Sequence, residues 1–339
     1  MDSFSKTLTV SAVVLIVGFS TALSRTESSK SSPPKKADGG DGPAVLWREP
    51  VDIATRDLFY GPGGKGHEPH GTFTYQGVDP HGSNPKFDVV DQDGVRWRVK
   101  VGREVHSETA ATRIVWAIGY FANEDYYLPE LRVENMPQLY WRGAPVGSKG
   151  VVKSVRLKRH LKDEKKIGFW TWADNPFKDT REWYGLRVLM AVINNWDLKD
   201  VNNSVYQVRD PVTEQHYVVS DVGASFGPRG WTWAPGGNLK AYANSPWMKS
   251  SSGDSVDFNV PGAPGWPNML NMAISVPHMR MGWLGRKIPI ADARWMGQLL
   301  AKLSPKQIRD AFRAAGYSPE EVEGYSEALQ KRIEELTKL

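Results

Sequence analysis

The chain of 339 residues contains no cysteine. Disulfides, thiolate-bound metals and a cysteine nucleophile are therefore excluded, and the redox compartment is left open. A large excess of one charge is also missing: the net charge is +5, and no stripe of lysine and arginine interleaved with aromatic residues is present. We therefore expect no nucleic-acid partner.

An apolar run covers residues 8–23, behind Lys6. We interpret residues 1–24 as a secretory signal peptide, because the run is shorter than the roughly 20 residues that span a membrane. Export to the periplasm or the exterior is the expected localisation. The alternative is an uncleaved membrane anchor: Arg25 and Lys30 follow the run, and positive charge on that side would keep the body in the cytoplasm. In either case we expect membrane contact only through this segment.

The rest of the chain divides by composition into three parts. Residues 25–43 are rich in Ser, Pro, Lys and Gly, which is typical of a disordered linker. Residues 44–160 contain a lead-in loop followed by alternating segments, and they predict a β-rich lobe. Residues 161–339 predict a mainly helical lobe. The fold class is therefore α+β.

Alternation of apolar and polar residues predicts a strand at 71–78 and a hairpin at 86–102, which turns at Asp93-Gly94. Apolar spacing predicts a helix over 107–121, with Ser107 as its N-cap. A second apolar helix is expected to begin near Thr180. Two C-terminal helices each begin with Ser-Pro, a cap followed by proline in the first turn.

Two charged residues stand out in the β-rich lobe. Lys100 lies near the end of the second hairpin strand; taken alone, it suits an edge lysine that prevents aggregation. Glu108 lies at the start of the following helix, where a carboxylate complements the helix dipole. Glu104, in the connecting turn, is the alternative carboxylate.

Three polar residues stand out in the helical lobe. Asp197 and Asn202 follow an apolar helix, and Asp221 ends the apolar strand "HYVVS" with Gly223 two residues later. Each alone suits a capped helix or an Asx turn. In order along the chain, strand lysine, helix glutamate, Asp-x-x-x-x-Asn and Asp-x-Gly match the needs of phosphoryl transfer, which are positioning and charge neutralisation.

The motifs resemble those of the protein-kinase-like superfamily. "DLKDVN" (197–202) is similar to the kinase catalytic loop, "DVG" (221–223) stands where Asp-Phe-Gly would, and "RWRVKV" (96–101) is similar to the strand that carries the nucleotide lysine. Among atypical branches, the chain resembles HipA-type kinases, phosphatidylinositol-kinase-like folds and secreted kinases. This resemblance implies a two-lobed fold with ATP and Mg²⁺ as cofactors.

The resemblance also implies a role for each residue. Lys100 would bind the nucleotide phosphates, and Glu108 would hold that lysine in place. Asp197 would act as the catalytic base on the acceptor. Asn202 and Asp221 would bind magnesium through oxygen, as that cation prefers.

The sequence departs from ordinary protein kinases at three points. Asn195-Trp196 precedes Asp197 where His-Arg is usual, no Ala-Pro-Glu follows Asp221, and no Gly-x-Gly-x-x-Gly motif joins the first strands. The turn at 79–86 is the candidate phosphate loop, and its candidate nucleotide-binding residues are Gly82, Ser83 and Lys86. The Gly-rich segment 60–70 lacks the P-loop spacing and is interpreted as a flexible loop.

A second function class fits the same fold. An inactive pseudokinase could use Trp-rich loops at 231–266, with Trp231 and Trp233, to recognise a glycan or a protein partner. For an active kinase, the phosphate acceptor could be a protein, a lipid headgroup or a sugar.

Overall fold

The computed structural model describes residues 35–80, 82, 84–195, 197–209, 211–227, 237–259 and 281–339. Four predictions fall outside the described residues: the leader at 1–24, the phosphate-loop Ser83, and Trp231 and Trp233 of the Trp-rich loops. Among the described residues, no helix is both long and apolar enough to cross a membrane.

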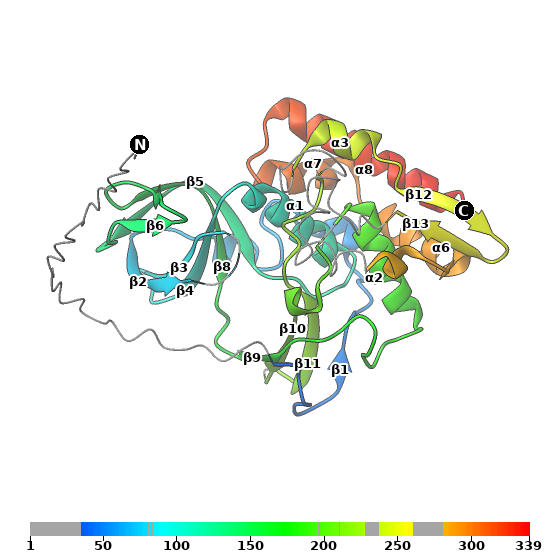
Figure 1. The fold of residues 1–339 in the computed structure, drawn as a ribbon, viewed down its shortest axis with the longest axis horizontal. Coiled ribbons are helices and arrows are strands. Elements are labelled where there is room, and N and C mark those ends of the chain that lie inside the picture. The colour runs from blue at the N-terminus through cyan, green and yellow to red at the C-terminus, as the bar shows by residue number, and fades with distance from the viewer. Residues whose placement is uncertain are drawn as a thin grey trace, which may run out of the picture. The chain divides into compact units, whose positions relative to one another are not determined.

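The N-terminal lobe is a closed five-stranded barrel with strand order β2-β3-β4-β8-β5 (Figure 1). Its strands are β2 (Phe73–Asp79), β3 (Lys86–Asp91), β4 (Arg96–Val101), β5 (Asp125–Glu134) and β8 (Val151–Arg159). The hairpin between β3 and β4 turns at Asp93-Gly94, as the sequence predicts. Parallel pairing of β2 with β5 closes the barrel, a long-range contact that no local pattern predicts. A small hairpin, β6 (Leu139–Trp141) and β7 (Ala144–Val146), lies between β5 and β8.

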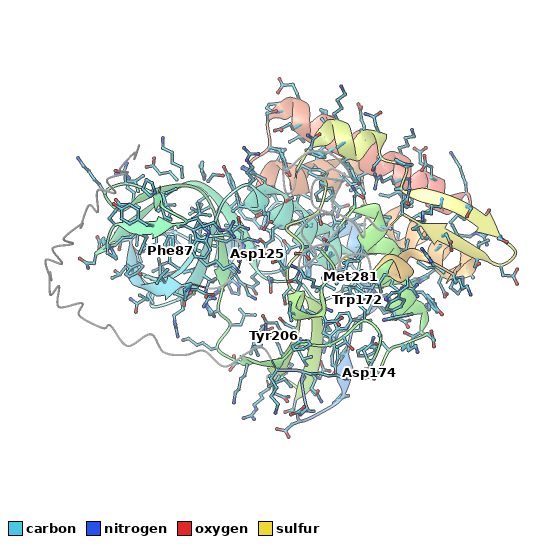
Figure 2. The ribbon with its side chains drawn as sticks, in the orientation of Figure 1. Phe87, Asp125, Trp172, Asp174, Tyr206 and Met281 are labelled. Carbon is cyan, nitrogen blue, oxygen red and sulfur yellow. The ribbon has the colours of Figure 1, made fainter. Side chains whose placement is uncertain are left out.

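Alternation along the strands sorts the side chains of the barrel. Phe87 and Val99 are fully buried within the barrel core, and Figure 2 shows Phe87 among its strands. Successive strand residues point to opposite faces. Lys86 and Lys100, which are directly paired across β3 and β4, therefore point outward from the same face.

Helix α1 (Glu104–Ala117) follows β4 at once. It begins three residues before Ser107, so the prediction of Ser107 as N-cap is wrong, and Arg103 occupies that position. The Ser107 hydroxyl instead donates to the carbonyl oxygens of Glu104 and Gly223. The Glu104 carboxylate forms an ion pair with Lys100, a contact that the local sequence pattern did not indicate.

In the described part of the chain, the C-terminal lobe contains most of the α-helices and two further sheets. Its helices are α2 (Arg181–Val192), α3 (Leu239–Asn244), α6 (Ile290–Leu300), α7 (Pro305–Ala314) and α8 (Pro319–Thr337). Thr180 caps α2, as predicted near that residue, and Ser304 and Ser318 form capping boxes ahead of proline. In Figure 1 the barrel strands, cyan to green, lie on the left and the orange helix α6 on the right.

The first sheet of this lobe has the order β1-β11-β10-β9. Its strands are β1 (Ala44–Val45), β9 (Glu164–Gly168), β10 (Asn203–Val208) and β11 (Glu214–Val219). The second sheet consists of β12 (Met248–Ser252), β13 (Ser255–Phe258) and β14 (Ile288–Pro289). Residues 160–163 connect the barrel to β9, so the chain passes from one lobe to the other there.

The segment before the barrel packs with the C-terminal lobe. Strand β1 pairs with β11, and Leu46 and Leu58 belong to the same hydrophobic core as the C-terminal helices. Residues 35–43, which the composition assigns to the linker, are bonded to this lobe as well. The side chain of Gln215, for example, donates to the carbonyl oxygens of Gly40 and Gly42.

Candidate active site

A polar cleft of about 430 Å³ lies between the outer face of the barrel and the sheet formed by β9 and β10. Its volume is within the range of small-molecule sites in proteins. The cleft is lined by Lys86, Arg98, Lys100, Glu108, Asn123, Arg156, Lys158, Arg159, His160, Leu161, Glu164, Lys166, Val201, Asn202, Ser204, Tyr206, Ser220 and Asp221.

Lys100 is the centre of the ion-pair network in this cleft. Its side chain is only 2% exposed. The ammonium group lies 2.9 Å from Glu108, 2.8 Å from Glu104 and 3.5 Å from Asp221. A buried ammonium requires partners for its charge. The two helix carboxylates and the strand-end aspartate supply them, so the consecutive elements β4 and α1 meet the distant Asp221 at one nitrogen.

The same contacts set the protonation of Lys100. Burial alone would lower the pKa of its ammonium, but Glu108, Asp221 and Glu104 together raise it above the usual value. Lys100 is therefore a permanent cation at neutral pH. A fixed positive charge on a rigid strand is the group required to hold a phosphate.

Asp221 is an ionised carboxylate in this environment. Burial acts to raise its pKa, yet the charges of Lys100 and Lys86 outweigh burial and lower it. The backbone N–H of Gly223 also donates to Asp221 Oδ1 at 3.3 Å. Asp221 thus presents negative charge at the end of the strand that precedes it.

Glu108 is held by a second cation, Arg156 on β8. The Arg156 guanidinium donates to Glu108 Oε1 at 2.9 Å and lies 3.4 Å from Asp125 Oδ1. Asp125 is fully buried, and burial raises its pKa to about 6. Figure 2 shows Asp125 where the barrel meets α1. The Glu108 carboxylate is therefore fixed from two sides, by Lys100 and by Arg156.

The predicted catalytic loop is folded around Asn202. Its side-chain amide donates to the Asp197 carbonyl oxygen at 2.9 Å, and its own carbonyl accepts from the Asp221 N–H at 3.2 Å. Asp197 pairs with Lys199 at 3.1 Å, and its side chain is 22% exposed. Asn202 and Asp221 line the cleft, whereas Asp197 lies beside it in the same loop.

The candidate phosphate loop approaches the cleft through Lys86. A side chain added at Gly82 would meet the Lys86 ammonium at 3.1 Å, so the two residues are neighbours. Burial and the nearby Lys100 lower the pKa of the Lys86 ammonium. The Asn84 side chain donates to Glu104 at 2.6 Å and ties the loop to the start of α1.

Sequence reasoning missed several residues of the site. The sequence motifs did not indicate Arg156, Asp125, Lys158 and Tyr206, because these residues join the site through contacts between separate strands. Glu104 was treated as an alternative to Glu108, but the structure places both carboxylates on Lys100. Because they are one helical turn apart, both can reach the same cation.

Among the residues that the structure describes, no three His, Asp or Glu side chains form a metal site by themselves. Asp221 and Asn202 nevertheless line the cleft and carry oxygen atoms, and Glu104 lies against the same Lys100 ammonium as Asp221. Oxygen atoms of this kind suit a hard divalent cation whose other ligands come from phosphate. In segment 60–70, His67 pairs with Glu124 at 2.9 Å and His70 with Asp93 at 3.1 Å.

The strand lysine, its helix glutamate and the strand-end aspartate thus meet between a β-rich and a mainly helical lobe. The described residues form the two lobes that the resemblance to protein kinases implies, a β-rich barrel and a mainly helical lobe. No protein-family model matches the sequence, and no curated protein matches it significantly.

Solved kinase structures are similar to this fold at 11% sequence identity. One is the Helicobacter pylori proinflammatory kinase CtkA, with a TM-score of 0.45, covering 80% of this chain and 97% of that chain. Another is the Golgi casein kinase, with a TM-score of 0.32, covering 77% and 75%. The Golgi casein kinase with Mn/ADP bound gives 0.32, 78% and 74%.

Proposed function

We propose that this protein is a phosphotransferase that uses a nucleoside triphosphate and a divalent cation. The observation that supports this most directly is that the carboxylates of Glu108 and Asp221 both lie close to the Lys100 ammonium at the edge of a polar cleft. ATP and Mg²⁺, which the sequence resemblance implies, remain predictions.

In the proposed reaction the chain's residues bind, orient and accept a proton. Lys100 and Lys86 neutralise the phosphates of the donor, since both cations line the cleft. Asp221, Asn202 and Glu104 would hold the divalent cation, which when bound supplies further positive charge to the phosphates. Arg156 and Glu108 keep Lys100 in position.

The chemical step is a transfer to an acceptor hydroxyl. The hydroxyl oxygen forms a bond to the γ-phosphorus, the bond from the γ-phosphorus to the bridging oxygen breaks, and the nucleoside diphosphate leaves. Asp197 accepts the hydroxyl proton, as a positioned carboxylate does in general-base catalysis. Lys199 lies 3.1 Å from Asp197 and balances the charge of its carboxylate. The acceptor class, whether protein, lipid headgroup or sugar, stays open.

The proposed localisation is outside the cytoplasm, on the basis of the apolar run at residues 8–23. Fractionation of expressing cells tests it. Recovery of the full chain in the soluble cytoplasmic fraction alone would contradict export.

The test of the function is phosphate transfer by Asp221→Ala beside Asp174→Ala. Asp174 is a matched control, because its side chain is 81% exposed and pairs with Lys36 at the surface. With labelled ATP or GTP and magnesium or manganese, we expect transfer to generic protein acceptors, or to water, by the wild type and the control. Loss in Asp221→Ala, with its melting temperature unchanged, supports the proposal. Equal activity in Asp221→Ala and the wild type would refute it.

A further inference from the structure

The roof of the cleft, by which we mean the outward face of the barrel, carries charged side chains at the place where a nucleobase would lie. Among the residues that line the cleft, only Leu161 and Val201 are aliphatic. The outward face of the barrel instead contributes Arg98 and Lys158 at this point, which pair across β4 and β8. A base in this cleft is therefore held by polar groups and by stacking rather than by an apolar slot.

The position of the base follows from the position of the phosphates. Lys100 marks the phosphate end, and Arg98 lies two residues earlier on the same strand face. At the strand rise of about 3.3 Å per residue, Arg98 is roughly 7 Å further along the cleft. Residues 160–163, which join the lobes, lie at this same end, and His160 and Leu161 line it. Arg98, Lys158 and their neighbours thus surround the base end.

Two flat groups are available for stacking at this end. The Arg98 guanidinium is fixed by Asp88 through two of its nitrogens and by Asp79 at 2.6 Å. Tyr206 of β10 lines the cleft from the other lobe, and Figure 2 shows it on the β10 side. Guanidinium planes and aromatic rings both stack on bases, and such stacking accepts any base. Stacking alone therefore does not select a base.

The polar groups at the edge of the base site can distinguish one nucleobase from another. Lys158 donates to the Tyr206 hydroxyl at 2.8 Å, and Lys166 is paired with Tyr206 in the β9–β10 ladder. Glu164 lies two residues before Lys166 on β9, so the two side chains leave the same face about 7 Å apart. The edge of the site thus presents two ammonium donors and, beside them, one carboxylate acceptor, all lining the cleft.

This pattern matches guanine. Guanine has acceptors at O6 and N7, which lysine binds, and donors at N1 and N2, which a carboxylate accepts. Adenine presents its N6 amine where guanine presents O6, and that amine faces an ammonium unfavourably. We propose that the cleft prefers guanine over adenine nucleotides, with Lys158 and Lys166 as donors to the O6 edge and Glu164 as the acceptor from N1 and N2. This inference rests on the proposed nucleotide-binding function.

The test compares the affinities of GDP and ADP for the full chain by calorimetry in the presence of manganese. We expect GDP to bind the wild type roughly tenfold more tightly than ADP, since one good two-bond contact contributes about that discrimination. Glu164→Ala should remove most of this preference by weakening the binding of GDP. Lys165→Ala is the control, because Lys165 is the next residue on β9 and does not line the cleft.

Each other outcome has a definite meaning. If ADP binds as tightly as GDP or more tightly, or if Glu164→Ala leaves the ratio unchanged, the guanine preference is wrong and the proposed phosphotransferase function stands. If neither diphosphate binds the wild type, the proposed function fails and the preference fails with it.

Discussion

Lys100 of the barrel and Glu108 of α1 form a buried ion pair at 2.9 Å, with side chains 2% and 1% exposed. The pair joins the last strand of a hairpin to the helix that follows it. Its burial matters for stability as well as for function, because a buried charge that loses its partner is costly. The first prediction concerns this pair.

Glu108→Gln should destabilise the protein by roughly 3–5 kcal/mol, because it leaves Lys100 and Arg156 with one compensating charge fewer. Chemical denaturation measures the free energy of unfolding. Glu130→Gln is the control: its pair with Arg132 is solvent-exposed, so the change should be within about 0.5 kcal/mol. Equal effects of the two variants would show that the buried network contributes no special stability.

Asp197→Asn should separate chemistry from binding. The amide cannot accept the acceptor's proton, so kcat should fall by roughly 10²–10⁴. Nucleotide affinity should not change, because Asp197 lies beside the cleft and not in its lining. Steady-state kinetics and calorimetry measure the two quantities. A variant with wild-type kcat would exclude Asp197 as the base.

Glu104→Gln should weaken the binding of the divalent cation more than the binding of the nucleotide. Glu104 and Asp221 both contact the Lys100 ammonium, at 2.8 and 3.5 Å, so their oxygens face one region. We expect the metal concentration for half-maximal activity to rise roughly tenfold, as for loss of one oxygen ligand or its support. An unchanged metal dependence would limit Glu104 to positioning Lys100.

Asp88 should give the protein an acid-sensitive contribution to stability. Burial acts to raise its pKa, but His160, 3.9 Å away, and the hydrogen-bonded Arg98 guanidinium outweigh burial and lower the pKa to about 2. The pKa of Asp88 is lower in the folded protein than in the unfolded protein, where it is near 4, so the ionised carboxylate stabilises the fold at pH values above about 4. This stabilisation is lost as the pH falls toward 2. After allowance for solvent screening, we expect about 1–2 kcal/mol.

The measurement is the free energy of unfolding between pH 6 and pH 2 for the wild type and Asp88→Asn. The variant should be less stable at pH 6, and the difference should shrink as the pH falls through this window. A difference in the free energy of unfolding that stays constant with pH would contradict the lowered pKa of Asp88.

Much of the local structure could be predicted from the sequence. The Asp93-Gly94 turn, the capped helices at Ser304 and Ser318 and the strand at β11 depend on neighbouring residues, so periodicity and turn chemistry identify them. The order of Lys100, Glu108 and Asp221 was also readable, and the structure brings these three side chains together.

The rest depends on contacts between residues distant in sequence. Closure of the barrel needs the pairing of β2 with β5, and the support of Glu108 by Arg156 joins positions 48 residues apart. The start of α1 at Glu104 was also missed, because Ser107 had the better local signal for an N-cap, although Glu104 pairs with Lys100 only four residues earlier. The role of the charged side chains on the barrel side of the cleft depends on Tyr206, which lines the cleft from β10.

The most direct test of the central claim is the shift in melting temperature that saturating nucleotide and manganese cause in the wild type and in Lys100→Met. A ligand at 100 times its Kd stabilises the native state by about 2.7 kcal/mol. The account predicts such stabilisation of the wild type by GTP or ATP, and little or none in a folded Lys100→Met variant. Equal stabilisation of both proteins, or of neither, would contradict it.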